Sequence, residues 1–444
     1  MAIRRGRRAR GRGSAATTPT GDTQVSAAAV AASTEQLLLA ALERGGDTLE
    51  TGRYLVTYRE GMAEEGANAL RAQDFRMADA RDFTGQAVAL EDAGDAEALN
   101  FPEIGVAVVS GAALEAHGMS TFAAAAADSP IETIEPEYFV FAAGSEYLRG
   151  FLAAANTIAR DLKGVPMPEE EEEVEAEVLG ATWGLLRCKV PPSSRSGVGI
   201  KVAVLDTGMD LGHADFSGRP MTAQTFVGQP VQDLNGHGTH CIGTACGPKS
   251  PPGSTPRYGI AYAGRIFVGK VLTNSGSGTG AGVLAGMNWA IANRCEVISM
   301  SLGSQSPVQA AYTAAGQAAL SAGCLIIAAA GNETSPTGAP ANSPTIMSVA
   351  SLDPNLRPSS FSNFGKIEIA APGRDVFSSW PRPRRYRTIS GTSMATPHVA
   401  GCAALWAQTS SSLRGAALWR RLQSSAQPLP LPASRVGAGL VQAP

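Results

Sequence analysis

The chain has 444 residues, of which 44% are hydrophobic and 17% are charged, so it has ample material for buried cores and is not wholly disordered. Its length predicts two or three domains. A net charge of −3 is close to neutral and argues against a dedicated nucleic-acid-binding protein, which needs a large basic face. No apolar run reaches the roughly 18 residues of a transmembrane helix.

The first segment, residues 1–50, is predicted to be a basic, mostly disordered tail with one helix over 27–45. The opening 20 residues carry six arginines, and no apolar stretch follows them as it does in a secretory signal. Arg4 and Arg5 suggest a twin-arginine export signal, but the missing apolar stretch argues against it. We therefore expect a protein that is cytoplasmic or exported by a non-classical route.

Residues 51–143 have the pattern of a small α+β domain. Strands alternate with helices in the order β-α-β-β-α-β, which predicts a ferredoxin-like fold. The strands are expected at 53–60, 85–92, 103–110 and 131–142, and the helices at 62–73 and 111–126. The strand over 85–92 has the weakest pattern of the four.

Residues 144–180 are predicted to form a connector. An amphipathic helix fits 147–162, and an acidic run with glutamates at 169–173, 175 and 177 follows it. The usual form of such a run is solvated, extended chain.

From residue 181 to 444, apolar β-branched strands alternate with alanine-rich helices. This pattern predicts a mostly parallel sheet sandwiched by helices, with its ligand site at the carboxyl ends of the strands. Strands are expected at 201–206, 266–272, 296–302, 324–331, 345–351 and 367–373, with helices at 280–294 and 307–323 among them.

Three chemically active side chains stand at strand ends or helix starts of this domain. Asp206 closes a strand, His237 opens a glycine-rich helix, and Ser393 begins an apolar helix. Singly, each has an ordinary role, as a helix cap or a turn residue. Together they can supply a nucleophile, a base and a carboxylate that orients the base.

The motifs DTGMD (206–210), HGTH (237–240) and GTSMATPHVAG (391–401) resemble those of the subtilisin-like serine proteases. SMSLG (299–303) and AAAGN (328–332) reinforce this resemblance, which covers about residues 181–425. It implies a serine endopeptidase with the catalytic residues Asp206, His237 and Ser393 in the chain order known for subtilisin. It also implies an oxyanion hole formed by the Asn332 side chain and the Ser393 backbone N–H.

The resemblance further implies that a substrate is bound as an added strand between two backbone edges. One edge is Ser301, Leu302 and Gly303, and the other is Gly276, Ser277 and Gly278, whose glycines allow close approach. An apolar pocket for the side chain four residues before the cut would be lined by Leu272, Val283 and Leu302, and open at Gly280. Gly338 and Pro340 resemble the floor of the pocket for the residue at the cut.

The sequence departs from the family at a common calcium site. Asp215 matches one family ligand, but residues 246–264, which would supply the others, contain no Asp, Asn or Glu. Calcium needs about six or more oxygen ligands. We therefore expect no required cofactor and no metal ligand among the site residues, although calcium binding elsewhere stays open. The six cysteines are scattered and favour buried thiols over a disulfide framework.

The N-terminal domain resembles the inhibitory propeptide of secreted subtilases. Its tail, 138–143, is extended and apolar and is expected to lie in the cleft with Val140 in the apolar pocket and self-cleavage after Ala143. The connector 144–180 separates this site from the enzyme, which leaves the maturation site open between 142 and 181. The alternative is that residues 50–143 are a folding helper or an unrelated module.

We therefore expect a serine endopeptidase made as a self-processing zymogen, whose partners are a polypeptide substrate and its own N-terminal domain. Two alternatives remain: an intracellular protease dedicated to one peptide precursor, and an idle subtilase fold that acts as a binding module. The arginine-rich segment 381–387 is either a solvated loop, a recognition site for acidic residues on the leaving-group side, or a dock for the acidic connector.

Overall fold

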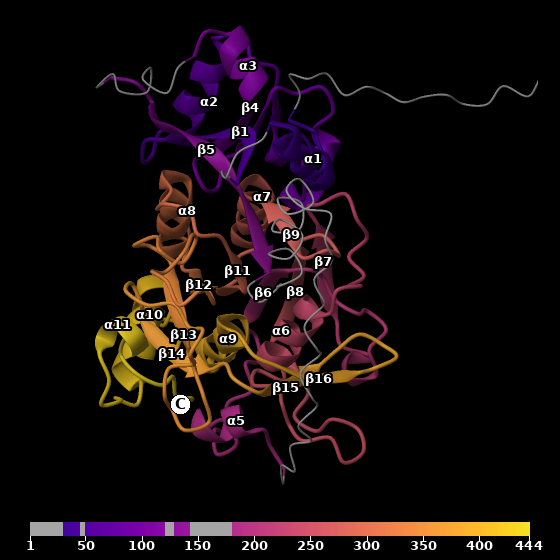
Figure 1. Ribbon diagram of the computed structural model, residues 1–444, viewed down its shortest axis with the longest axis vertical. Coiled ribbons are helices and arrows are strands. Elements are labelled where there is room, and N and C mark those ends of the chain that lie inside the picture. Colours follow the sequence, from indigo (N-terminus) through magenta and orange to yellow (C-terminus); the bar gives the residue numbers. More distant parts are fainter. Residues whose placement is uncertain (1–29, 45–48, 120–127, 143–179) are drawn as a thin grey trace, which may run out of the picture.

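The computed structural model describes residues 30–44, 49–119, 128–142 and 180–444. The N-terminal domain, which we define as residues 49–142, lies above a larger C-terminal domain, residues 180–444 (Figure 1). No helix within the described residues is both long and apolar enough to cross a membrane. The predicted connector helix 147–162, the acidic run 169–177 and Ala143 lie outside the described residues.

The N-terminal domain is one antiparallel sheet with short helices on its outer face. Its strands follow the order β5-β1-β4-β3-β2, and only the pair β2–β3 is parallel. Helix α1 (Thr34–Arg44) precedes the domain. The elements of the domain are β1 (Glu50–Tyr58), α2 (Ala63–Arg71), β2 (Met77–Asp79), β3 (Ala98–Phe101), β4 (Val106–Ser110), α3 (Gly111–Ala116) and β5 (Ile131–Ala142).

The strand predicted over 85–92 is wrong. The 3-10 helices Thr84–Gln86 and Leu90–Ala93 occupy this stretch, and the strand is β3, which pairs with β4. All four residues of β3 are buried, because Ala98 packs under the helices α2 and α3 while Leu99 and Phe101 join a core shared with the C-terminal domain. A strand buried on both faces lacks the alternation of apolar and polar residues that the prediction relied on.

The C-terminal domain contains a seven-stranded parallel sheet, as the apolar runs predict. Its strand order is β14-β13-β12-β10-β6-β8-β7. The strands are β6 (Lys201–Asp206), β7 (Met221–Thr225), β8 (Arg265–Lys270), β10 (Val297–Met300), β12 (Leu325–Ala329), β13 (Met347–Leu352) and β14 (Ile369–Pro372).

Helices cover both faces of this sheet, which explains why its strands are continuously apolar. Val202 and Val204 of β6 face a core with α6 (His237–Cys246) and α9 (Thr392–Thr409). Ala203 and Leu205 face the opposite core with α7 (Gly280–Ala292) and α8 (Ala310–Ser321). The remaining elements are α5 (Trp183–Arg187), a 3-10 turn (Ala214–Phe216), β9 (Ser277–Thr279), β11 (Leu302–Gly303), the hairpin β15 (Val376–Ser379) and β16 (Tyr386–Ile389), α10 (Gly415–Ser425) and α11 (Ala433–Val436).

Strand β5 belongs to both domains. Its first part pairs with β1, and its last residues, 139–142, continue downward and pair with β9 and β11 (Figure 1). The N-terminal domain therefore sits on the side of the sheet covered by α7 and α8, with its last strand inserted between two edges of its neighbour.

Candidate active site

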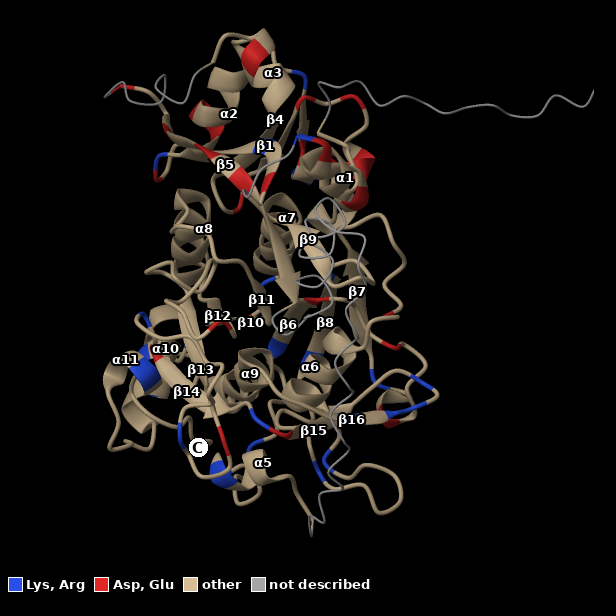
Figure 2. Cartoon of the chain, viewed as in Figure 1, with Lys and Arg blue, Asp and Glu red and all other residues tan. Residues whose placement is uncertain are grey.

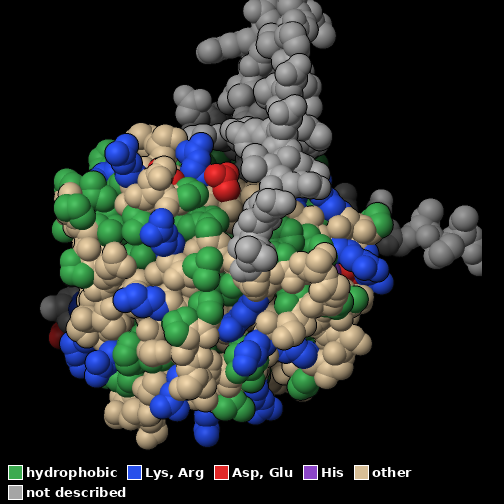
Figure 3. Space-filling model, turned by 90° about the horizontal axis from the view of Figure 1, so that it is seen from below, with side chains coloured by type: hydrophobic (Ala, Val, Ile, Leu, Met, Phe, Trp, Pro, Cys, Tyr) green, Lys and Arg blue, Asp and Glu red, His purple; other side chains and the backbone are tan. Residues whose placement is uncertain are grey.

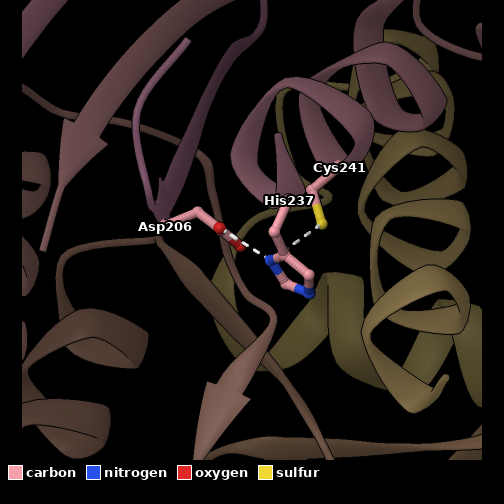
Figure 4. A group of neighbouring side chains, drawn as sticks. All are labelled: Asp206, His237 and Cys241. Atoms are coloured by element: carbon pink, nitrogen blue, oxygen red, sulfur yellow. Dashed lines mark hydrogen bonds and ion pairs between the residues drawn. The ribbon is translucent and has the colours of Figure 1, made fainter. Parts of the chain in front are cut away.

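Asp206 and His237 meet where β6 ends and α6 begins. The His237 Nδ1 lies 2.7 Å from Asp206 Oδ1, and both side chains are buried (Figure 4). Gly236, directly before the histidine, has a φ of 109°. A side chain there would also collide with Trp380, whose ring atoms lie 2.3 Å from an ideal Cβ position. Glycine is therefore required to turn the chain into α6.

A carboxylate that the sequence analysis missed holds this turn. Asp233 is fully buried and accepts hydrogen bonds from the backbone N–H groups of Asn235, Gly236 and Thr239 and from the hydroxyls of Thr207 and Thr239, at 2.7–3.0 Å. It thus links the residue after Asp206 to the residues around His237. An acidic residue in a polar turn four positions before the histidine was the available signal.

The carboxylate of Asp206 governs the charge of His237. Burial alone disfavours the imidazolium, but the nearby Asp206 carboxylate outweighs it, so the pKa of His237 is raised well above its ordinary value of 6.5. Its Nε2 has no hydrogen-bond partner among the described residues, although it is buried. This nitrogen is the atom that a general base would use to accept a proton from a nucleophile.

Ser393 is held at the start of α9 by two reciprocal contacts with Ser301. The Ser393 Oγ donates to the Ser301 carbonyl at 3.1 Å, and the Ser301 Oγ donates to the Ser393 carbonyl at 2.8 Å. This carbonyl is available because Pro397, four residues further along the helix, has no N–H to donate. The thiol of Cys241 also reaches it, at 3.6 Å.

Cys241 brings the serine and histidine segments together. It lies one turn after His237 on α6, with its sulfur 4.0 Å from His237 Nδ1 (Figure 4). The same sulfur contacts the Ser393 carbonyl. One ligand atom each from Asp206, His237 and Cys241 fall within 4.8 Å of one another, a spacing suited to a metal ion. However, burial raises the pKa of the Cys241 thiol, and metals bind the thiolate. The site therefore fits a structural thiol better than a resident metal.

Asn332 is oriented by the residue before the nucleophile. Its Oδ1 accepts hydrogen bonds from the Thr392 N–H and the Thr392 hydroxyl, both at 2.9 Å. Because these two donors can bond only to the amide oxygen, they fix the orientation of the Asn332 amide, and its Nδ2 is free to donate elsewhere. The sequence analysis assigned no part to Thr392.

The two predicted backbone edges flank the last residues of β5. On one side, Val140 pairs with Gly278 and Phe141 with Ser277, and the Ala142 N–H donates to the Gly276 carbonyl at 2.9 Å. On the other side, Ala142 pairs with Leu302. The tail of the N-terminal domain thus completes a three-stranded antiparallel sheet, in the manner of an added strand.

The predicted apolar pocket lies beside this tail. Val140, Leu272 and Val283 are buried in one core, and an ideal Cβ on Gly278 would lie 2.9 Å from the Leu272 side chain and 3.5 Å from that of Val140. An ideal Cβ on Gly280 would lie 3.3 Å from the Glu137 side chain and 3.5 Å from the Tyr138 carbonyl oxygen. Gly338 lies beyond β11, where the next residue, Ala339, bridges to Ser304 ahead of Pro340.

The donors around Asp215 do not fit a calcium site. Its carboxylate accepts hydrogen bonds from the hydroxyls of Tyr258 and Tyr386. Tyr258 belongs to the same segment, 246–264, that lacks carboxylate and amide ligands. Two phenol donors occupy the oxygens that a cation would need, so this position is a buried hydrogen-bond cluster that joins β16 to its neighbours.

The arginine-rich segment 381–387 spans most of the turn of the hairpin β15–β16 and the first two residues of β16. Arg382 donates from its backbone N–H and its guanidinium to both oxygens of Asp210, at 2.8–3.0 Å, and these bonds hold the Asp210 pKa well below its usual range. Arg387 lies 4.9 Å from the Trp380 ring centre. The face of the molecule seen in Figure 3 carries many Lys and Arg side chains and few acidic ones.

Comparison with known proteins identifies the family of the C-terminal domain. Residues 197–439, more than half of the chain, match the subtilase family. The chain belongs to the subtilase family. Alkaline protease from Shouchella clausii is 38% identical to it over 282 residues, which cover 62% of this chain and 72% of that protein. Subtilisin Savinase from Lederbergia lenta is 39% identical over 268 residues, which cover 59% of this chain and 96% of that protein.

The fold of this subtilase is also that of solved relatives. The crystal structure of a cold adapted subtilisin-like serine proteinase aligns with a TM-score of 0.54 and 35% identity, covering 60% of this chain and 99% of the other. The protein is thus a subtilisin-like serine endopeptidase, with an α/β sheet flanked by helices as predicted. The comparisons match the enzyme part and do not assign the individual residues of its site.

The charge of His237 predicts the pH dependence of hydrolysis. An imidazolium cannot accept a proton, so kcat/KM should rise with pH through the pKa of His237, with a midpoint above 6.5 because Asp206 stabilises the charged form. Asp206→Asn should lower both this midpoint and the rate, the latter by about 10⁴. Peptide hydrolysis measured from acidic to alkaline pH checks both. A midpoint that does not move in Asp206→Asn would contradict the assignment.

The orientation of Asn332 predicts a selective loss of rate. Asn332→Ala removes a donor that acts only on a developing oxyanion, so kcat should fall by about 10²–10³ with little change in KM. Asn355→Ala is the control, because Asn355 lies in an exposed turn. Steady-state kinetics on one peptide substrate decide the matter, and an equal effect of the two substitutions would argue against an oxyanion hole at Asn332.

Proposed function

We propose that this subtilase cleaves peptide bonds with Ser393 as nucleophile, His237 as general base and Asp206 as the carboxylate that orients the base. The observation that carries the proposal is the buried 2.7 Å contact between Asp206 and His237, whose Nε2 has no partner among the described residues, beside the anchored start of α9. Such a base can accept the serine proton as Oγ attacks the substrate carbonyl.

The remaining steps follow from the groups around the nucleophile. The tetrahedral oxyanion would be stabilised by the Nδ2 of Asn332, by the Ser393 N–H and by the positive end of α9. His237 would then return the proton to the leaving amine as the C–N bond breaks. In the second half, His237 would take a proton from a water molecule as that water attacks the acyl carbonyl, and would give it to Ser393 Oγ as the acyl group leaves. Our proposal includes no metal, and the donor set at Asp215 supports independence from calcium at that position.

We further infer that the enzyme is made as a zymogen with four parts. Residues 1–50 form a tail that includes α1, residues 51–143 the inhibitory domain, 144–180 the connector, and 181–444 the catalytic domain. The sheet order β5-β1-β4-β3 supports a ferredoxin-like inhibitory domain, to which β2 adds an edge. Self-cleavage would follow Ala143, one residue beyond the described end of β5.

Two glutamates of β5 support an inhibitory role, because each caps a helix of the enzyme. Glu137 accepts a hydrogen bond from the Ala281 N–H at 2.6 Å, in the first turn of α7, and Glu135 accepts one from the Ala311 N–H at 3.0 Å, in the first turn of α8. Carboxylates at helix N-termini satisfy unpaired donors and interact favourably with the helix dipole. Both contacts form only when the two domains are docked.

A buried ion pair adds to this interface. The Arg53 guanidinium donates to both oxygens of Glu137, at 2.6 and 3.1 Å, and to the Thr279 hydroxyl of β9 at 3.0 Å. Figure 2 shows acidic residues on the N-terminal domain and basic ones mainly on the lower part of the enzyme, away from this interface, so the docking contacts are the specific buried ones described here. The arrangement favours a domain that covers the cleft over an unrelated module.

Neither alternative function has an observation in its favour. An idle binding module would not need an unpartnered, buried Nε2 beside the nucleophile. A protease dedicated to one precursor differs from a general one in its substrate, and the apolar pocket around Val140 is compatible with many sequences.

Ser393→Ala is the central test of the proposal. Removing the nucleophile should lower peptide hydrolysis by about 10⁶, and the variant should stay full length while the wild type shortens to a product that begins near Gly144. N-terminal sequencing and peptide kinetics give the two readouts. Ser390→Ala, whose hydroxyl bonds Asp375 on the surface, is the control. Hydrolysis by Ser393→Ala above about a thousandth of wild type would refute the triad.

Glu137→Ala should release the inhibitory domain. It leaves the buried Arg53 without its carboxylate, which typically costs about 3–5 kcal/mol, so the dissociation constant of the cleaved domain should rise by about 10²–10⁴. The measurement is the residual activity of the cleaved complex as a function of its concentration. Glu132→Ala, on an exposed position of the same strand, is the control. Equal inhibition in both variants would contradict the proposed interface.

The pocket around Val140 predicts substrate preference. Peptides with a bulky apolar side chain four residues before the cut should exceed those with Asp there by about 10–100-fold in kcat/KM, since each buried side chain contributes about 1.5–3 kcal/mol. At the cut itself we expect broad, mostly apolar choice. A peptide library analysed by mass spectrometry checks this, and equal cleavage of Phe and Asp peptides would exclude the pocket.

A further inference from the structure

We propose that residues 30–44, which precede the N-terminal domain and end with helix α1, form a second lock that holds the inhibitory domain on the enzyme after self-cleavage. The proposal rests on the inhibitory function proposed above and extends it to a segment outside the domain itself. The lock would act through contacts on both sides of the interface.

Helix α1 has a defined start and one buried face. Ser33 and Gln36 form a reciprocal cap, in which the Gln36 N–H donates to the Ser33 hydroxyl and the Ser33 N–H donates to the Gln36 side chain, at 3.3 and 2.9 Å. Leu37 is 9% exposed, whereas Leu39 on the same helix is 61% exposed. The helix therefore packs through one side, near β1 and β9 (Figure 1).

The start of the segment is bonded to the buried ion pair. The Val30 carbonyl accepts a hydrogen bond from Arg53 Nη1 at 3.0 Å, and the Val30 N–H donates to the Ala96 carbonyl at 2.9 Å. Val30 itself is fully buried. The same guanidinium bonds Glu137 within the domain and Thr279 across the interface, so without Val30 one donor of a buried charge would lose its partner.

The helix also reaches the enzyme directly. Gln229 donates from its side chain to Glu35 of α1 at 3.0 Å, and its side-chain oxygen accepts from the Asn274 N–H at 2.8 Å. Asn274 precedes the edge Gly276–Gly278 that pairs with the inhibitory tail. Gly228, beside Gln229, lies against Glu91 of the N-terminal domain, so both parts of the N-terminal chain hold the same loop.

These contacts matter most once the chain is cut. The inhibitory domain then stays bound through its tail, its two helix caps and the α1 contacts, and contacts that act together raise the effective concentration of each other. Loss of one set should speed release without changing the cleavage chemistry, which takes place elsewhere.

The test follows full-length protein through self-cleavage and records the lag before an added peptide is hydrolysed. Deletion of residues 1–48 and Leu37→Glu should each shorten the lag about 10–100-fold while the extent of self-cleavage stays the same. Leu39→Glu, on the exposed side of α1, should leave both unchanged. Gln229→Ala, which alters only the enzyme side, should shorten the lag without affecting the folding of the inhibitory domain.

A second readout uses uncut Ser393→Ala protein. Hydrogen exchange at Ser277–Thr279 and at residues 139–142 should become faster when residues 1–48 are deleted. A wild-type lag that survives the deletion, Leu37→Glu and Gln229→Ala would overturn the lock and leave the inhibitory domain standing. A wild type that is fully active with no lag would remove the inhibitory function and the lock together.

Discussion

The contact between the Asp206 carboxylate and the His237 imidazole is the interaction on which the arrangement of the site depends. Both groups are buried, and a buried charge is tolerated only where other groups compensate for it. Asp233 supplies part of the frame by accepting five hydrogen bonds: two from the turn before His237, two from Thr239 after it and one from Thr207. The Lys270 ammonium donates to the Thr207 carbonyl and to the Asn274 side chain. Burial lowers the pKa of Lys270 to about 8, although the carboxylates of Asp233 and Asp206 act in the opposite direction.

The nucleophile segment is placed by backbone chemistry more than by charge. Pro397 frees the Ser393 carbonyl, and Ser301 and Cys241 use it as an anchor for the first turn of α9. The partner of Ser393 in this exchange, Ser301, directly precedes β11, one of the two edges that hold an added strand. The segment Ser301–Gly303 thus contacts both Ser393 and the end of β5.

Strand β5 connects this site to the rest of the molecule. It begins in the antiparallel sheet of the N-terminal domain and ends between β9 and β11. The position of the N-terminal domain therefore fixes where the end of β5 lies in the cleft of the enzyme. Glu135 and Glu137 face α8 and α7, the two helices that start nearest to it. In the docked molecule these carboxylates pair with helix-terminal N–H groups that would otherwise bond to water.

The sequence by itself determined the parallel sheet, the candidate residues Asp206, His237 and Ser393, and the extended tail 138–143, which the structure describes as far as Ala142. These features are local, because apolar runs, strand ends and helix starts leave their pattern in neighbouring residues. Only the tertiary structure decided which groups surround them. The pairing of Ser301 with Ser393, the tyrosine hydroxyls on Asp215 and the burial of β3 between two domains join segments far apart in the chain. Hydrogen bonds and buried faces of this kind depend on how distant elements pack, and sequence periodicity reports which face of an element is apolar but not what covers it.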